Sequence, residues 1–196
     1  MIKSAINYLL GQLELNPLFK KVYPFAGLVR DDKGTYPAVY IGGSDQKSIE
    51  LDENFSMCYL RMRGNVDFNV NTEKKYNIIS CKNDIFDIRV PVRLVCFISK
   101  SIDDDSCKGF EDLTFAQNIL GELSNYNLTS NSTGAKHASL MPDQILTDNF
   151  KLLSDEYGNN APVDFNYEYS YFAIDFVINF VANKDCFACV TPDYTT

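Results

Sequence analysis

The sequence of 196 residues is 45% hydrophobic and 22% charged, and its formal net charge at pH 7 is -8. A chain of this length and composition can bury a sizeable core, which excludes a disordered or fibrous protein. The net negative charge provides no overall basic field for nucleic-acid phosphates or anionic lipid, so tight DNA binding is not expected. No apolar run approaches the roughly 18 residues that a membrane-spanning helix needs, so we expect no membrane partner.

The N-terminal part of the chain combines one helix with short strands. Apolar residues at helical spacing predict a helix over residues 2–15, which ends before Pro17 because the residue before proline disfavours the α region. Short β segments at 22–30 and 36–41 flank the turn signal at 31–34. These two segments are predicted to form a hairpin.

The middle of the chain is dominated by one long amphipathic strand. A strand is predicted at 55–63, followed by a polar stretch at 65–77 and a second segment at 76–80. Residues 86–98 then alternate strictly between apolar and other side chains, which predicts a long strand with one buried face. Pro91 cannot donate a ladder hydrogen bond, so we expect it at a sheet edge or at a bulge.

The C-terminal half predicts a further helix, a loop and a second long strand. A helix is predicted over 111–124, followed by a polar loop at 126–138 within an insertion at about 125–142. Pro142-Asp143 is predicted to open a third helix that runs through Leu146, Phe150 and Leu153 and closes before Gly158. Residues 168–182 alternate as a final strand. Together these elements predict a single α+β domain over 1–196, with a mostly antiparallel, twisted sheet of long strands and helices packed on one face.

No motif in the sequence identifies a catalytic or cofactor site. Cys186 and Cys189 have CxxC spacing, but one such pair is not a zinc site, and strand-end packing is the simpler interpretation. His137 is the only histidine and no nucleophile is evidently partnered with it. The acidic run at 103–105 lacks the ligand spacing of an EF-hand, and Gly42 belongs to no phosphate-loop motif. We therefore expect no catalytic, metal or cofactor-binding residues and no enzymatic activity.

The cysteines are expected to be reduced. All six occur in a chain whose first residues lead into a helical pattern rather than a signal peptide. Several lie within apolar strand patterns, where a free thiol behaves as a small hydrophobe. A reducing compartment and core packing are therefore predicted.

Basic residues lie beside an aromatic residue at one strand. Arg61 and Arg63 follow Tyr59, and such a pair could touch a nucleic-acid backbone transiently. With 18 basic against 26 acidic residues, a solvated strand face is the other interpretation. Both remain open from the sequence.

The final strand carries a second face that is too apolar for free exposure to water. Tyrosine and apolar residues of this kind are covered either by another layer of the same chain, such as a helix, or by a partner subunit. The end of the earlier long strand has the same property. The residues that we predict for an interface on this basis are Tyr167, Tyr169, Tyr171, Val177, Val95 and Phe97.

The order of the predicted elements resembles that of a known structural family. A short N-terminal helix precedes strands that end in Val90-Pro91-Val92-Arg93-Leu94-Val95-Cys96-Phe97, followed by a helix over 115–123 and a final strand at 169–176. This arrangement resembles the tail-terminator and tail-completion proteins of tailed bacteriophages. The Asn-rich composition, the final strand and Lys184-Asp185-Cys186 are similar to neck or ring proteins of crAss-like phages. The long segments at 126–143 and 65–83 depart from the smaller family members.

The resemblance implies a structural role in a virion. It suggests a homo-oligomeric ring at the neck or tail that joins the phage head, at its portal, to the tail and lets DNA pass without specific binding. Its partners would be copies of itself and neighbouring portal, neck or tail proteins, in a virion assembled in the bacterial host cytoplasm. The alternatives are a monomeric protein-binding module that uses the 126–138 loop and, third, a cryptic enzyme.

Overall fold

Two helices and nine strands lie in the residues that the computed structural model describes, which are 2–31, 34–42, 45–48, 55–71, 85–99, 111–124, 137–147, 151–152, 154–155 and 169–183. In chain order they are α1 (Ile2–Leu15), β1 (Lys21–Tyr23), β2 (Gly27–Asp31), β3 (Gly34–Gly42), β4 (Asp45–Ser48), β5 (Met57–Met62), β6 (Asp67–Asn71), β7 (Ile85–Ser99), α2 (Glu111–Ser124), β8 (His137–Leu146) and β9 (Tyr169–Asn183).

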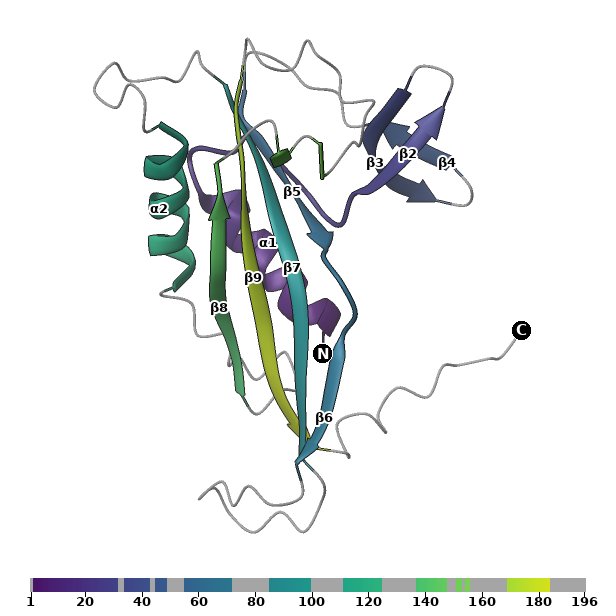
Figure 1. Ribbon diagram of the computed structural model, residues 1–196, viewed down its shortest axis with the longest axis vertical. Coiled ribbons are helices and arrows are strands. Elements are labelled where there is room, and N and C mark those ends of the chain that lie inside the picture. Colours follow the sequence, from purple (N-terminus) through teal and green to yellow (C-terminus); the bar gives the residue numbers. More distant parts are fainter. Residues whose placement is uncertain are drawn as a thin grey trace.

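The main sheet has six strands in the order β1-β5-β7-β9-β8, with β6 also paired to β7 (Figure 1). β1 runs parallel to β5, and the other neighbours are antiparallel. A second sheet of three antiparallel strands, β2-β3-β4, lies beyond the β5 side. The predicted α+β class and mostly antiparallel sheet are confirmed. Neither described helix is long and apolar enough to cross a bilayer.

The pairing of β7 with β9 forms the centre of the sheet. Both strands have 15 residues and they pair along their whole length, from Ile85 opposite Asn183 to Ser99 opposite Tyr169. At about 3.4 Å per residue this ladder is roughly 50 Å long. Because side chains alternate along a strand, the even-numbered residues of both strands lie on one face, here called the first face, and the odd-numbered residues on the second face.

The first face forms the main hydrophobic core beneath both helices. Buried side chains recur along α1 and α2 at the spacing of one helical face, as the sequence predicted. Each fully buried aliphatic or aromatic side chain contributes about 1.5 to 3 kcal/mol. The buried helix residues of this core are Ile6, Leu9 and Leu13 on α1 and Ala116, Ile119 and Leu123 on α2. The helices therefore pack on one face of the sheet, as expected.

Asn16 ends α1 and connects it to α2. Its side-chain Oδ1 accepts a hydrogen bond from the backbone N–H of Leu18 at 2.8 Å, which turns the chain after the last helical residue. Its Nδ2 donates to Oε2 of Glu122 on α2. Asn16 is buried, so both ends of its amide are used inside the fold. The predicted helix end before Pro17 is confirmed.

Pro91 lies where β7 changes partners. β5 leaves the ladder at Met62, opposite Val92, and β6 joins it at Asp67, opposite Arg89. The backbone N–H of Arg63 donates to the Pro91 carbonyl at 3.1 Å, so the backbone groups of Pro91 point toward this interruption. The missing N–H therefore leaves no ladder bond unmade, although Pro91 lies within the central strand β7 and not at the sheet edge or bulge that we expected.

The third helix, predicted to open at Pro142 and to close before Gly158, is wrong at its start. Residues 137–146 form strand β8, which pairs with β9 and occupies part of the predicted 125–142 insertion. Tertiary pairing explains the difference, because Leu140 and Ile145 pack against the first-face core from an edge strand. Among the described residues of this predicted helix, 151–152 and 154–155 are helical.

The structure confirms the N-terminal hairpin and adds two short strands, β1 and β6, that we did not predict as separate elements. β2 and β3 pair as predicted, while residues 21–23 form the separate strand β1 beside β5. β6 at 67–71 lies within the polar stretch at 65–77, for which we predicted no strand. The segment predicted at 76–80 lies outside the described residues.

Cys58 and Cys96 face each other in the core. They are directly opposite in the β5–β7 ladder, fully buried, and present as free thiols. Burial raises the pKa of both thiols well above its ordinary value, and the neighbouring Cys58 adds to the effect on the pKa of Cys96. Both therefore act as apolar core residues, as predicted for cysteines within strand patterns.

This pair predicts a loss of stability in alkaline solution. The unfolded thiols ionise at about pH 8.5 whereas the folded ones stay protonated, so their contribution is complete below that pH and declines above it. We expect the free energy of unfolding to fall by up to about 1.4 kcal/mol per pH unit for each thiol. Urea unfolding under reducing conditions, followed upward from neutral pH, measures this slope. A Cys58→Ala/Cys96→Ala variant should show a clearly flatter slope, and an equal slope would contradict the assignment.

Candidate interaction surface

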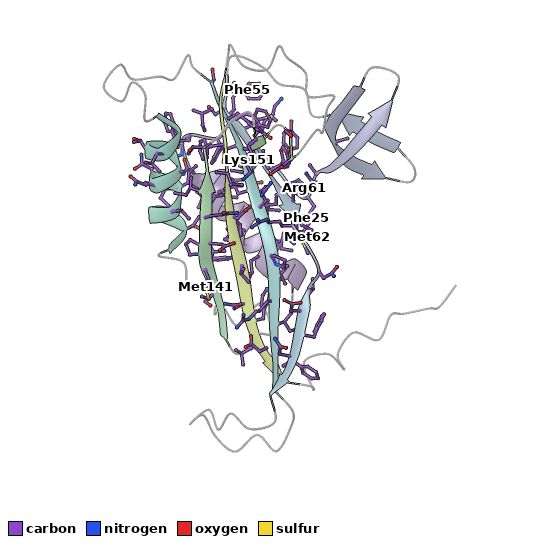
Figure 2. All side chains as sticks on the ribbon, viewed as in Figure 1. Phe25, Phe55, Arg61, Met62, Met141 and Lys151 are labelled. Atoms are coloured by element: carbon purple, nitrogen blue, oxygen red, sulfur yellow. The ribbon has the colours of Figure 1, made fainter. Side chains whose placement is uncertain are left out.

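The second face of the sheet differs in character between its two halves. It carries the odd-numbered residues of β7 and β9, flanked by residues of β5 and β6 on one side and of β8 on the other. The half near Ser99 is covered by the chain itself, and the half near Ile85 is largely open. In Figure 2, Phe55 and Lys151 are labelled near the covered half of this face and Met141 on its open half.

The covered half is a second hydrophobic cluster. The ring centroid of Phe97 lies 4.6 Å from that of Tyr171 and 6.3 Å from that of Tyr59, in tilted geometry. Residues from outside these strands complete the layer, including Phe55 before β5 and Leu152 in the short helical segment. The buried members are Ala26, Phe55, Met57, Tyr59, Val95, Phe97, Leu152, Tyr171 and Ala173.

Three of the predicted interface residues are core residues of the folded chain. Val95, Phe97 and Tyr171 are 0%, 1% and 3% exposed. The alternative that part of the same chain covers this face therefore holds for them, and they are not available as exposed contacts. Tyr169 pairs with Ser99 in the ladder but its side chain lies outside the described set, as does the whole of residue 167.

A polar row separates the two halves of the second face. Arg93 on β7 binds Asp175 on β9 through two parallel contacts, Nε to Oδ1 at 2.7 Å and Nη2 to Oδ2 at 3.1 Å. Asp175 Oδ2 also accepts a hydrogen bond from Nε2 of Gln144 on β8 at 2.8 Å and lies 2.6 Å from Nη1 of Arg63. One buried carboxylate thus connects three strands and the end of a fourth.

The charges of this row are neutralised locally. Burial alone would lower the pKa of Arg93, but its hydrogen bond to Asp175 and the negative charge of that carboxylate outweigh burial and raise the pKa. Arg63 also contacts Asp143, with 3.3 Å between Nη1 and Oδ2, where both side chains are exposed. Arg63 is thus held by two carboxylates, while Tyr59, its aromatic neighbour in sequence, is buried.

The open half of the second face combines apolar and polar residues. Val177 stands between Pro91 on β7 and Met141 on β8, and the Met141 side chain is 54% exposed. Val177 and Pro91 are partly exposed, and Arg89 beyond them is exposed. Among the predicted interface residues whose side chains are described, Val177 is therefore the accessible one.

The residues that the sequence offered for catalysis, metal binding or phosphate binding form no such site among the described residues. His137 begins β8 opposite Val181, but its side chain is not described, and Cys186, Cys189 and residues 103–105 lie outside the described residues. Gly42 ends β3 opposite Asp45. Within the described residues, no group of three or more His, Cys, Asp and Glu side chains is placed to hold a metal ion.

The Arg93–Asp175 pair was missed by sequence reasoning. Both residues were assigned to the polar alternation of their strands, although Asp175 is the one charged residue between Tyr171 and Val181. An isolated charge within an apolar strand pattern is a signal for a buried ion pair, because a charge is rarely buried without a partner. Its partner could be identified only once the register of β7 and β9 was known.

We predict that Asp175→Asn destabilises the fold. The substitution keeps the shape of the side chain but leaves Arg93 buried without its counter-charge, which typically costs about 3 to 5 kcal/mol. Urea denaturation of the purified variant measures the loss. Asp143→Asn removes an exposed carboxylate of the same network and should change stability by less than about 0.5 kcal/mol. Similar effects of the two substitutions would contradict the central role of Asp175.

Comparisons with known proteins add no relative to this description. No protein-family model matches the chain, and no curated protein is similar to it in sequence.

Proposed function

We propose that this chain is a structural subunit that assembles with copies of itself and with neighbouring virion proteins into a neck or tail connector ring of a tailed bacteriophage. The observation that carries the proposal is the open half of the second sheet face, where Val177 and the exposed Met141 lie on a long strand ladder. Exposed apolar side chains rimmed by polar ones are typical of protein contact surfaces. The order of helices and strands resembles that of tail-terminator and neck proteins.

The sheet supplies the stiffness that such a subunit needs. The β7–β9 ladder is continuous over 15 residues, packed beneath two helices on the first face and beneath the Phe97 cluster at one end of the second. A contact surface on rigid strands loses little conformational entropy when a neighbour binds. The open half of the second face is thus suited to a fixed contact between subunits.

The charge of the chain is compatible with a DNA passage. The net charge of -8 repels nucleic-acid phosphates, so a ring of such subunits would not retain DNA that moves through its lumen. Arg63 and Arg93, in the middle of the second face, are already engaged by carboxylates. The proposal therefore assigns DNA transient passage and no specific binding site.

We predict that the purified chain forms rings, alone or with a portal, neck or tail protein of the same virion. Native mass spectrometry gives the stoichiometry and negative-stain microscopy the shape. A Met141→Arg/Val177→Arg variant should keep its fold but lose assembly, because charges without partners would have to be desolvated at the contact. Tyr171→Arg should instead unfold the chain, since that side chain is core. A chain that remains monomeric with every virion protein tested would exclude the connector function.

A further inference from the structure

In the described part of the chain, three strands lie at free edges of the main sheet, namely the three-residue β1 and the longer β6 and β8, and the two longer ones are built differently. In the described part of the chain, β8 pairs only with β9, and β6 pairs only with β7. Unpaired edges expose N–H and C=O groups that invite another strand, and proteins commonly block them with proline, bulges or charge. Of β6 and β8, only β8 has a proline and a register shift.

Pro142 opposes the addition of another strand at the β8 edge. The backbone groups of Pro91 point away from β9, so those of Val177, opposite it, point toward β8 and its partner Met141. Pro142, the next residue, is therefore directed outward, where its missing N–H removes a donor from the edge. A register shift between Pro142 and Gln144, and the exposed Asp143 at that shift, add to the protection.

The β6 edge has neither proline nor register shift. Asp67 is opposite Arg89, whose backbone groups point toward β6 because they share the direction of Pro91. Hence Asp67 bonds inward, and the N–H and C=O groups of Phe68 and Val70 point outward. Phe68 is also 56% exposed, which is unusual for a phenylalanine in a strand.

We propose that β6 pairs antiparallel with β6 of a second copy of this chain, centred on Asn69. The strand reads Asp-Phe-Asn-Val-Asn and alternates symmetrically about its middle residue. With Asn69 opposite Asn69, Phe68 of each copy stands opposite Val70 of the other, and Asp67 opposite Asn71. In this register the apolar positions 68 and 70 of one copy are opposite apolar positions of the other, and no like charges are opposed.

This register also satisfies the backbone best. Residue 68 of each copy forms a hydrogen-bonded pair with residue 70 of the other, so there are two such pairs, one on each side of the two-fold axis. Every outward N–H and C=O group of the strand is then used. A shift by two residues in either direction would oppose Phe68 to Phe68 or Val70 to Val70 and form one such pair. A shift by one residue would place the copies' equivalent faces on opposite sides.

The contact is independent of the proposed function. A two-fold contact is isologous and builds pairs, so it does not by itself close a ring, which needs a second, heterologous surface. Because five residues per copy form a small interface, we expect weak association. Salt should strengthen it, since each copy carries a net charge of -8 and added ions screen the repulsion.

Cross-linking at the symmetry axis tests the pairing in the full-length chain. Asn69→Cys places two cysteines opposite each other in a non-hydrogen-bonded pair, with Cα atoms about 4.5 Å apart, which is within disulfide range. Oxidised glutathione should convert this variant to a covalent dimer through a 69–69 disulfide, identified by peptide mass spectrometry. Asn71→Cys is the matched control, because its two copies would lie about 14 Å apart along the strands. Equal cross-linking of the two variants, or none at position 69 above the unsubstituted protein, would overturn the proposal.

A second measurement needs no cysteine. Phe68→Lys should weaken association at least about tenfold in sedimentation velocity, because lysine at an edge opposes strand addition. Leu15→Lys removes a similarly exposed apolar residue from α1 and should leave association unchanged; the reverse result would contradict the pairing. Ring formation is scored separately by microscopy. Cross-linked pairs without rings would remove the connector function alone, and rings without the 69–69 link would remove the edge pairing alone.

Discussion

The continuous pairing of β7 with β9 is the constraint on which the other parts of the structure depend. Every other strand of the main sheet joins this ladder directly, except β1, which reaches it through β5. Because side chains alternate along a strand, the register of this one pair decides which residues both helices cover and which form the second face. A slip of one residue would move Phe172, Ile174 and Phe176 out of the core and expose them.

Asp175 makes that register costly to change. Hydrophobic alternation rejects a slip by one residue but tolerates a slip by two, since the apolar sets would coincide again. In the observed register Arg93 lies directly opposite Asp175, and a shift by two would separate the charges while both remained buried. Replacing a buried ion pair by apolar residues is often neutral for stability, so the role that we assign to this pair is specification of register.

The parts that the sequence could predict are those set by local pattern. The period of two in residues 86–98 and the helical spacing in 2–15 and 111–124 specify element type without tertiary information, and the structure has all three. The second half of β8 was mistaken for the start of a helix because Leu146, together with Phe150 and Leu153 beyond the strand, fits a helical face, and only the pairing with β9 decides between the two. The cover over Val95 comes from residues distant in sequence, such as Phe55 and Leu152, which no periodicity reveals.

The division of the second face follows from these distant contacts. The aromatic residues that first suggested an interface are buried in the half of the second face that contains Phe97. The exposed apolar side chains therefore lie beyond the Asp175 row and along β6. The two surfaces differ in kind. The open face offers side chains on a rigid platform, whereas the β6 edge offers backbone groups whose pattern is complementary to itself. The two proposed contacts are thus unlike each other, as an assembly of paired subunits requires.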